Sequence, residues 1–106
     1  MKITYIAHPV SGDVVGNIEK ILDIVRKINM EEPETVPFVP YLADLYALDD
    51  SIPAERERGI KNGVEIIRRG IPDEIRLYGN RISNGMEAER KAGIAAGIPI
   101  VDNTGA

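Results

Sequence analysis

The sequence contains no cysteine and only one histidine, His8. Without cysteine, the chain has neither a disulfide framework nor a metal site built from thiolates. With a single histidine, carboxylates are the only plentiful metal ligands that remain. A zinc site is therefore not expected.

The chain also lacks an excess of positive charge and any long apolar run. It has 13 Lys and Arg against 17 Asp and Glu, which gives a net charge of −4. Proteins that bind nucleic-acid polymers need clustered cations to displace the counterions of phosphates, so such a partner is not expected. No apolar run approaches the roughly 20 residues of a membrane span, and we do not expect a signal peptide before the first strand. We expect a cytoplasmic protein with no membrane partner.

Residues 1–106 are expected to form a single domain, with no internal repeat or linker. Residues 2–7 predict a strand with little polar alternation, which is typical of a parallel strand covered on both faces. From Asn17 to Ile28 apolar residues recur every three or four positions, which predicts an amphipathic helix. Residues 35–39 predict another strand. Pro37 has no N–H to donate to a central ladder, so this strand is expected at a sheet edge.

The rest of the chain continues this alternation of strands and helices. Residues 41–52 are expected to form an irregular segment that can include one helical turn. Pro53 suits the first turn of a second helix, which Gly70 ends. Residues 75–78 predict a third strand, Asn84 is the expected N-cap of a helix that runs to Ala96, and residues 98–101 predict a fourth strand.

This order predicts an α/β fold, a flavodoxin- or Rossmann-like three-layer sandwich with a parallel sheet of about four strands in the order 2-1-3-4. Ligands of such sheets bind beyond the carboxyl ends of the strands, where the strand order reverses. If the first strand lies beside the third, the loops that begin at His8 and Gly79 flank that crevice.

The start of the last helix carries the most informative polar residues. Ser83, Asn84 and Gly85 form a small loop whose free N–H groups, with the helix dipole, favour a phosphate or a sugar hydroxyl. Glu89 lies about one turn into the helix, and a carboxylate there can attack an anomeric carbon. The alternative for Glu89 is a solvated helix carboxylate. Asn84 and Glu87 have the spacing of a capping box, so Glu87 is interpreted as a capping residue.

Two further residues are candidates for chemistry, each with a structural alternative. Tyr5 could orient the carboxylate through its hydroxyl, or it could be an aromatic core residue. Glu65 could protonate a departing base as a general acid, or it could pair on the helix surface with Arg68 or Arg69.

The turn after the first strand contributes candidate substrate contacts. His8 and Pro9 end that strand, at a position where they are candidates for contact with a ligand. Ser11 and Gly12 form a second turn whose N–H groups could face an anion.

Three segments together resemble one enzyme superfamily. These are Tyr5-Ile6-Ala7-His8-Pro9, Ser83-x-Gly85-x-x-x-Glu89 and Ala92-x-x-x-Ala96-Gly97-Ile98-Pro99-Ile100. In this order and spacing the chain resembles the nucleoside 2-deoxyribosyltransferase superfamily over almost its whole length. It looks closest to the small, often phage-encoded members of unknown function.

The resemblance implies a role for each matching residue. Glu89 would be the nucleophile that attacks the sugar C1′, Tyr5 would orient it, and Glu65 is the nearest match to the acid that handles the proton on the base. The activity would be transfer to another base or hydrolysis of a nucleotide, with a nucleoside or nucleotide as the small-molecule partner. No metal or organic cofactor is implied, and a homo-oligomer is expected.

Two other functions remain open at this stage. A nucleotide-binding or sequestering module that has lost the chemistry is favoured by His8 and Ser83, which replace the superfamily's more usual glycine and acidic residue. A structural protein that uses the sheet only as a scaffold is the third, because a fold alone does not determine function.

Overall fold

The computed structural model describes residues 1–105, which form four strands and four helices. In chain order these are β1 (Lys2–Ala7), α1 (Val14–Glu31), β2 (Thr35–Phe38), α2 (Leu42–Ala47), α3 (Pro53–Arg68), β3 (Glu74–Leu77), α4 (Asn84–Ala95) and β4 (Ile100–Asp102).

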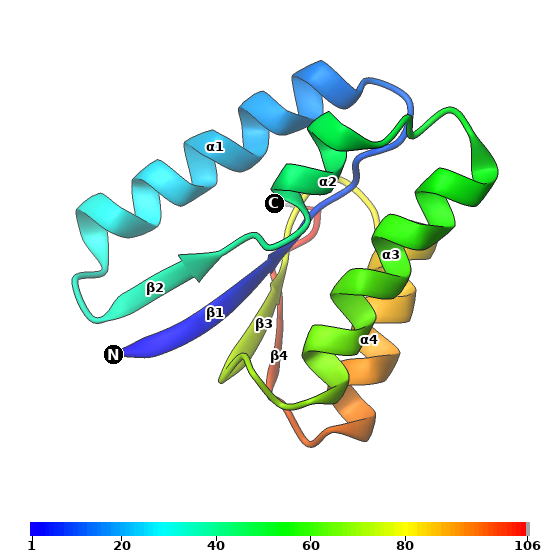
Figure 1. Ribbon diagram of the computed structural model, residues 1–106. Helices are drawn as coiled ribbons and strands as arrows, with labels where there is room; N and C mark the ends of the chain where they lie inside the picture. Colours follow the sequence, from blue (N-terminus) through cyan, green and yellow to red (C-terminus); the bar gives the residue numbers. More distant parts are fainter. Residues whose placement is uncertain (106) are drawn as a thin grey trace.

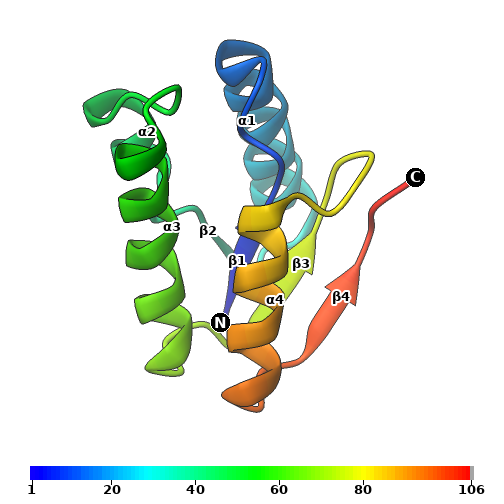
Figure 2. The same cartoon turned by 90° about the vertical axis from the view of Figure 1, so that its right-hand side faces the viewer.

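The four strands form one parallel sheet in the order β2-β1-β3-β4. The predicted α/β fold and strand order are therefore confirmed. Helix α1 lies on one face of the sheet, and α3 and α4 lie side by side on the other (Figures 1 and 2). This division follows from right-handed crossovers, because the chain moves one way from β1 to β2 and the opposite way from β2 to β3. The strand order thus reverses between β1 and β3.

The two faces of the sheet carry different side chains. Tyr5 pairs in register with Ile75, and Ala7 with Leu77, so these apolar residues share the face covered by α3 and α4. On the opposite face Arg76 forms a two-pronged ion pair with Glu32, just after α1, with two N···O distances of 2.8 Å. The site described below lies on the side of α3 and α4.

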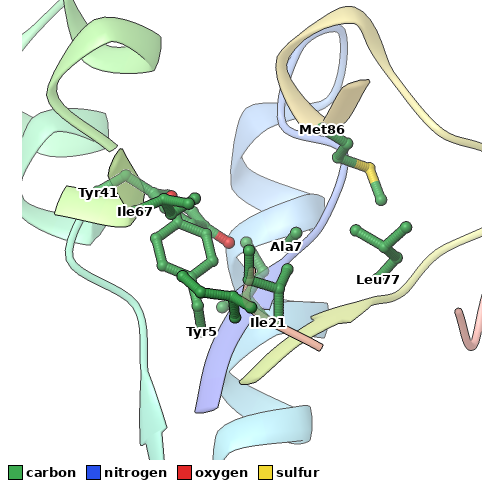
Figure 3. Packing of buried hydrophobic residues seen from close by; sticks show 9 residues of the cluster. Tyr5, Ala7, Ile21, Tyr41, Ile67, Leu77 and Met86 are labelled. Atoms are coloured by element: carbon green, nitrogen blue, oxygen red, sulfur yellow. The ribbon is translucent and has the colours of Figure 1, made fainter. Parts of the chain in front are cut away.

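The core on that side is built from β1, β3 and the helices above them. Tyr5, Ile67 and Leu77 are fully buried, and Met86 points from the start of α4 toward Leu77 (Figure 3). Gly93 lets α4 pack closely on the sheet, since a Cβ there would lie 2.5 Å from Cδ1 of Ile75. This close packing holds α4 in a defined position over β3.

Several elements differ in extent from those predicted, most by one residue at an end, and three differences are larger. Helix α1 begins at Val14 rather than Asn17, because Asp13 caps it by accepting a hydrogen bond from the Gly16 N–H at 3.0 Å. Residues 42–47, predicted to be largely irregular, form the short helix α2. The last strand begins at Ile100 rather than residue 98. The predicted edge position of the strand containing Pro37 is confirmed, since β2 ends the sheet.

Candidate functional site

A pocket of about 400 Å³ lies between β1, α2, the start of α3 and the start of α4. Tyr5 and Glu89 form part of its wall, together with residues from the loops after β1 and β3. This location agrees with the crevice predicted at the reversal of strand order. The predicted site residues that line it are Tyr5, His8, Ser11, Ser83, Asn84, Gly85 and Glu89.

Tyr5 and Glu89 lie in direct contact although they are 84 positions apart in the chain. The Tyr5 hydroxyl donates a hydrogen bond to Oε2 of Glu89. Tyr5 is fully buried and Glu89 is 9% exposed. Glu89 is therefore not the solvated helix carboxylate that the sequence left open as its alternative.

The ring of Tyr5 is held by two other aromatic rings. Phe38 meets it edge to face at a centroid distance of 6.3 Å, and Tyr41 lies tilted against it at 5.9 Å. The arrangement of Tyr5 and Tyr41 can be followed in Figure 3. With the ring packed in this way, the hydroxyl reaches Glu89 on α4.

Burial controls the protonation of the pair. It raises the pKa of Glu89 from 4.5 to about 7, while the hydrogen bond from Tyr5 acts in the opposite direction. Burial, and then the charge of Glu89, raise the pKa of Tyr5 well above its ordinary value of 10.0. Near neutral pH both the protonated and the ionised carboxyl are therefore populated, and the tyrosine stays a hydrogen-bond donor.

Tyr41 is a pocket residue that the sequence analysis did not single out. Its hydroxyl donates to the carbonyl oxygen of Ile6 at 2.6 Å, which ties the segment before α2 to β1. Burial raises its pKa well above 10.0. Its position in a segment predicted to be irregular gave no periodic pattern from which a site role could be inferred.

The N-terminus of α4 differs from the prediction by one residue. Ser83, not Asn84, is the N-cap, and its Oγ accepts a hydrogen bond from the Met86 N–H at 3.3 Å. The predicted capping box between Asn84 and Glu87 is therefore wrong. Glu87 instead forms an ion pair with Arg90 at 2.7 Å, one turn along the same helix.

Pro9 and Gly12 do not line the pocket, in contrast to the other predicted substrate contacts. Pro9 packs on Gly79, where a Cβ would lie 2.6 Å from Cδ of Pro9 and where φ is +97°. This contact joins the loops after β1 and β3. His8 is buried beside it, and its Nδ1–H donates to the Pro9 carbonyl at 2.7 Å. Burial lowers the pKa of His8, which favours the neutral ring at pH 7.

Glu65 lies outside the pocket. Its carboxylate forms ion pairs with Arg68 at 2.7 Å and Arg69 at 2.8 Å on the surface of α3. Hydrogen bonds from these two side chains, Arg68 first, lower its pKa to about 2. The surface pairing that the sequence allowed as an alternative is confirmed, and a carboxyl with so low a pKa is a poor general acid at neutral pH.

Other carboxylates line the pocket on the side of α2 and α3. They are Asp44, Asp50, Glu55 and Glu57, accompanied by Arg56, while Arg81 approaches from the loop before α4. Asp44 is the carboxylate anchored by a neighbouring helix, since its Oδ2 accepts a hydrogen bond from Asn62 of α3 at 3.2 Å. Sequence reasoning missed Asp44 because nothing in its local pattern predicts contact with α3.

Residues 1–105 contain no group of three or more His, Asp or Glu side chains arranged to hold a metal ion. Within the same residues, no helix has the length and apolar character that crossing a membrane requires.

Comparison with known proteins gives one match. No curated protein and no solved structure matches the chain significantly. A family model described as a domain of unknown function, DUF7768, matches residues 2–103, which is nearly the whole chain. The parallel α/β protein described above therefore belongs to the DUF7768 family.

Proposed function

We propose that this protein cleaves or transfers the N-glycosidic bond of a nucleoside or nucleotide, with Glu89 as the nucleophile. The observation that carries the proposal is the hydrogen bond from Tyr5 to the buried Glu89 carboxylate at the wall of a pocket of about 400 Å³. The resemblance to the nucleoside 2-deoxyribosyltransferase superfamily assigns these same two residues to the nucleophile and its orienting group. The parallel sheet and its strand order are consistent with that superfamily.

In the proposed reaction an oxygen of the ionised Glu89 carboxylate bonds to the anomeric carbon of the sugar. The bond from that carbon to the base nitrogen breaks, and its electron pair leaves with the base. Attack by water, or by a second base, then breaks the glycosyl ester and releases Glu89. Tyr5 directs the carboxylate oxygen by donating its hydroxyl proton in a hydrogen bond throughout.

The departing base needs a proton, and we propose Asp44 rather than Glu65 as its source or relay. Asp44 lines the pocket and is held by Asn62, whereas Glu65 is paired with two arginines outside it. An Asp44 carboxylate at the pocket wall would also accept a hydrogen bond from an N–H of the base.

The ionisation of Glu89 gives this mechanism a pH dependence. Only the ionised carboxylate is a nucleophile, and burial raises its pKa to about 7. The value of kcat/KM is therefore expected to rise with pH through this region.

The test is to incubate the protein with deoxynucleosides and with their 5′-monophosphates, with and without an acceptor base, and to measure released base. Glu89→Ala should abolish release, while Glu87→Ala should retain it, since Glu87 is a surface partner of Arg90 on the same helix. Asp44→Asn should lower turnover and Glu65→Gln should not. The absence of base release by the wild type, or undiminished release by Glu89→Ala, would refute the proposal.

A nucleotide-binding module remains the second proposal. It is favoured by the position of Glu65, which is this chain's nearest match to the superfamily's acid but lies outside the pocket. Calorimetric titration with the same nucleosides and nucleotides separates the two. Binding without turnover would support the module, and the absence of both would remove both proposals.

A further inference from the structure

Gly63 lies on the buried face of α3, directly against the hydroxyl of Tyr5. A Cβ at this position would lie 2.6 Å from Tyr5 Oη and 3.8 Å from Oε2 of Glu89. The first distance is far shorter than a non-bonded contact between carbon and oxygen allows. Helix α3 can therefore pack this closely on Tyr5 and Glu89 only because residue 63 has no side chain.

The packing around Tyr5 opposes any movement of its hydroxyl. Its ring is fully buried and is held between the edge contact with Phe38 and the tilted contact with Tyr41. Rotating the ring would open a void in the core and break the hydrogen bond to Glu89. A side chain at position 63 would therefore displace either the hydroxyl or α3 itself.

A second observation limits the clash to the hydroxyl oxygen. The next Tyr5 atom, Cζ, would lie 3.8 Å from the added Cβ, which is ordinary van der Waals contact. A phenylalanine at position 5 would therefore leave room for alanine at position 63. The helix itself would prefer alanine, because glycine is unfavourable in a helix interior.

We propose that Gly63 is a positioning residue: because it has no side chain, α3 packs closely against the Tyr5 hydroxyl while that hydroxyl donates its hydrogen bond to Glu89. The catalytic consequence of this role rests on the function proposed above. The structural role does not, because it concerns the geometry and protonation of the pair in the protein without substrate.

The first experiment compares Gly63→Ala in two backgrounds by thermal denaturation. With Tyr5 present, Gly63→Ala should lower Tm clearly. In the Tyr5→Phe variant the same substitution should leave Tm unchanged or raise it. If Gly63→Ala unfolds the protein with Tyr5 but the double variant folds, the proposal is equally supported. An equal loss of Tm in both backgrounds, or failure to fold in both, would overturn it.

The second experiment reads the hydrogen bond itself, by an NMR titration of the Glu89 side-chain carboxyl carbon. Displacing the hydroxyl removes a donor that favours the ionised carboxylate, so Gly63→Ala should move the titration midpoint upward. If Gly63→Ala does not fold in the Tyr5 background, this titration cannot be made, and the comparison of the two backgrounds by denaturation tests the proposal.

Gly59→Ala is the matched control on the same helix. Its Cβ would meet only Asp44 Cβ at 3.9 Å and Leu48 Cδ1 at 4.0 Å. This variant should leave the Glu89 midpoint unchanged. A folded Gly63→Ala variant with an unshifted midpoint, or an equal shift in Gly59→Ala, would refute the positioning role. Neither measurement uses turnover, so the absence of base release would refute the proposed reaction alone.

Discussion

Replacing Glu89 with glutamine should make the protein more stable at neutral pH, although it removes the proposed nucleophile. Glutamine keeps the size of the side chain and an oxygen that can accept the hydrogen bond from Tyr5. It removes the cost of holding a negative charge at a site where the side chain is only 9% exposed. The gain in the free energy of unfolding should therefore grow with pH as the carboxyl of the wild type ionises.

The sign follows from the pKa of Glu89, which burial raises from 4.5 to about 7. Below pH 4.5 the carboxyl is protonated in both the folded and the unfolded chain. Between pH 4.5 and about 7 the unfolded chain loses the proton and the folded protein keeps it, so the wild type loses stability as pH rises. At about 1.4 kcal/mol per pKa unit, the rise from 4.5 to about 7 makes the full loss about 3.5 kcal/mol, of which about 3 kcal/mol falls between pH 4.5 and 8.5.

The assay is urea denaturation followed by circular dichroism at several pH values from 4.5 to 8.5. The free energy of unfolding of Glu89→Gln minus that of the wild type should grow by about 3 kcal/mol across this range. Groups such as His8 and Glu32 also titrate with shifted pKa values, but they are common to both proteins and cancel in the difference.

Glu87→Gln is the control on the same helix. The Arg90 side chain lowers the pKa of Glu87, so the wild type gains stability from this group above its unfolded pKa and loses it as pH falls. Its difference curve should be small and of opposite sign. A Glu89→Gln difference that stays constant with pH would show that Glu89 ionises like a surface carboxylate, and the reasoning about the site would fail.

Three further substitutions, one of them with its own control, test other features of the structure. Tyr5→Phe should move the titration of the Glu89 carboxyl to higher pH, because the hydroxyl favours the ionised form; an unchanged NMR midpoint would contradict the hydrogen bond. Ser83→Ala should cost about 1 kcal/mol in urea denaturation through loss of the N-cap, whereas Asn84→Ala should stay within about 0.5 kcal/mol, and equal effects would contradict the assignment of the cap. Gly93→Ala should lower the free energy of unfolding by about 1–3 kcal/mol, since its Cβ would lie 2.5 Å from an isoleucine methyl of β3; unchanged thermal stability would argue against the close packing of α4 on the sheet.

The sequence by itself determined the order of elements and the topology of the sheet. The run of apolar residues in β1, the helical periodicity of α1 and the proline in β2 are local features, and each is readable within a short window. Chain handedness then leaves few ways to arrange alternating strands and helices. For Tyr5 and Glu89 the sequence left a structural alternative open, and their expected meeting in one crevice came from the family resemblance.

Tertiary structure alone decided which polar residues meet. The Glu65 carboxylate and its two arginines lie within one helix, yet sequence could not choose between that pairing and a site role, because the choice depends on which face of α3 meets the pocket. The contact of Asp44 with Asn62 and the approach of Gly63 to Tyr5 join distant segments. The raised pKa of Glu89 likewise comes from burial by β1, α3 and α4 together, and no local pattern in the sequence records how closely those elements pack.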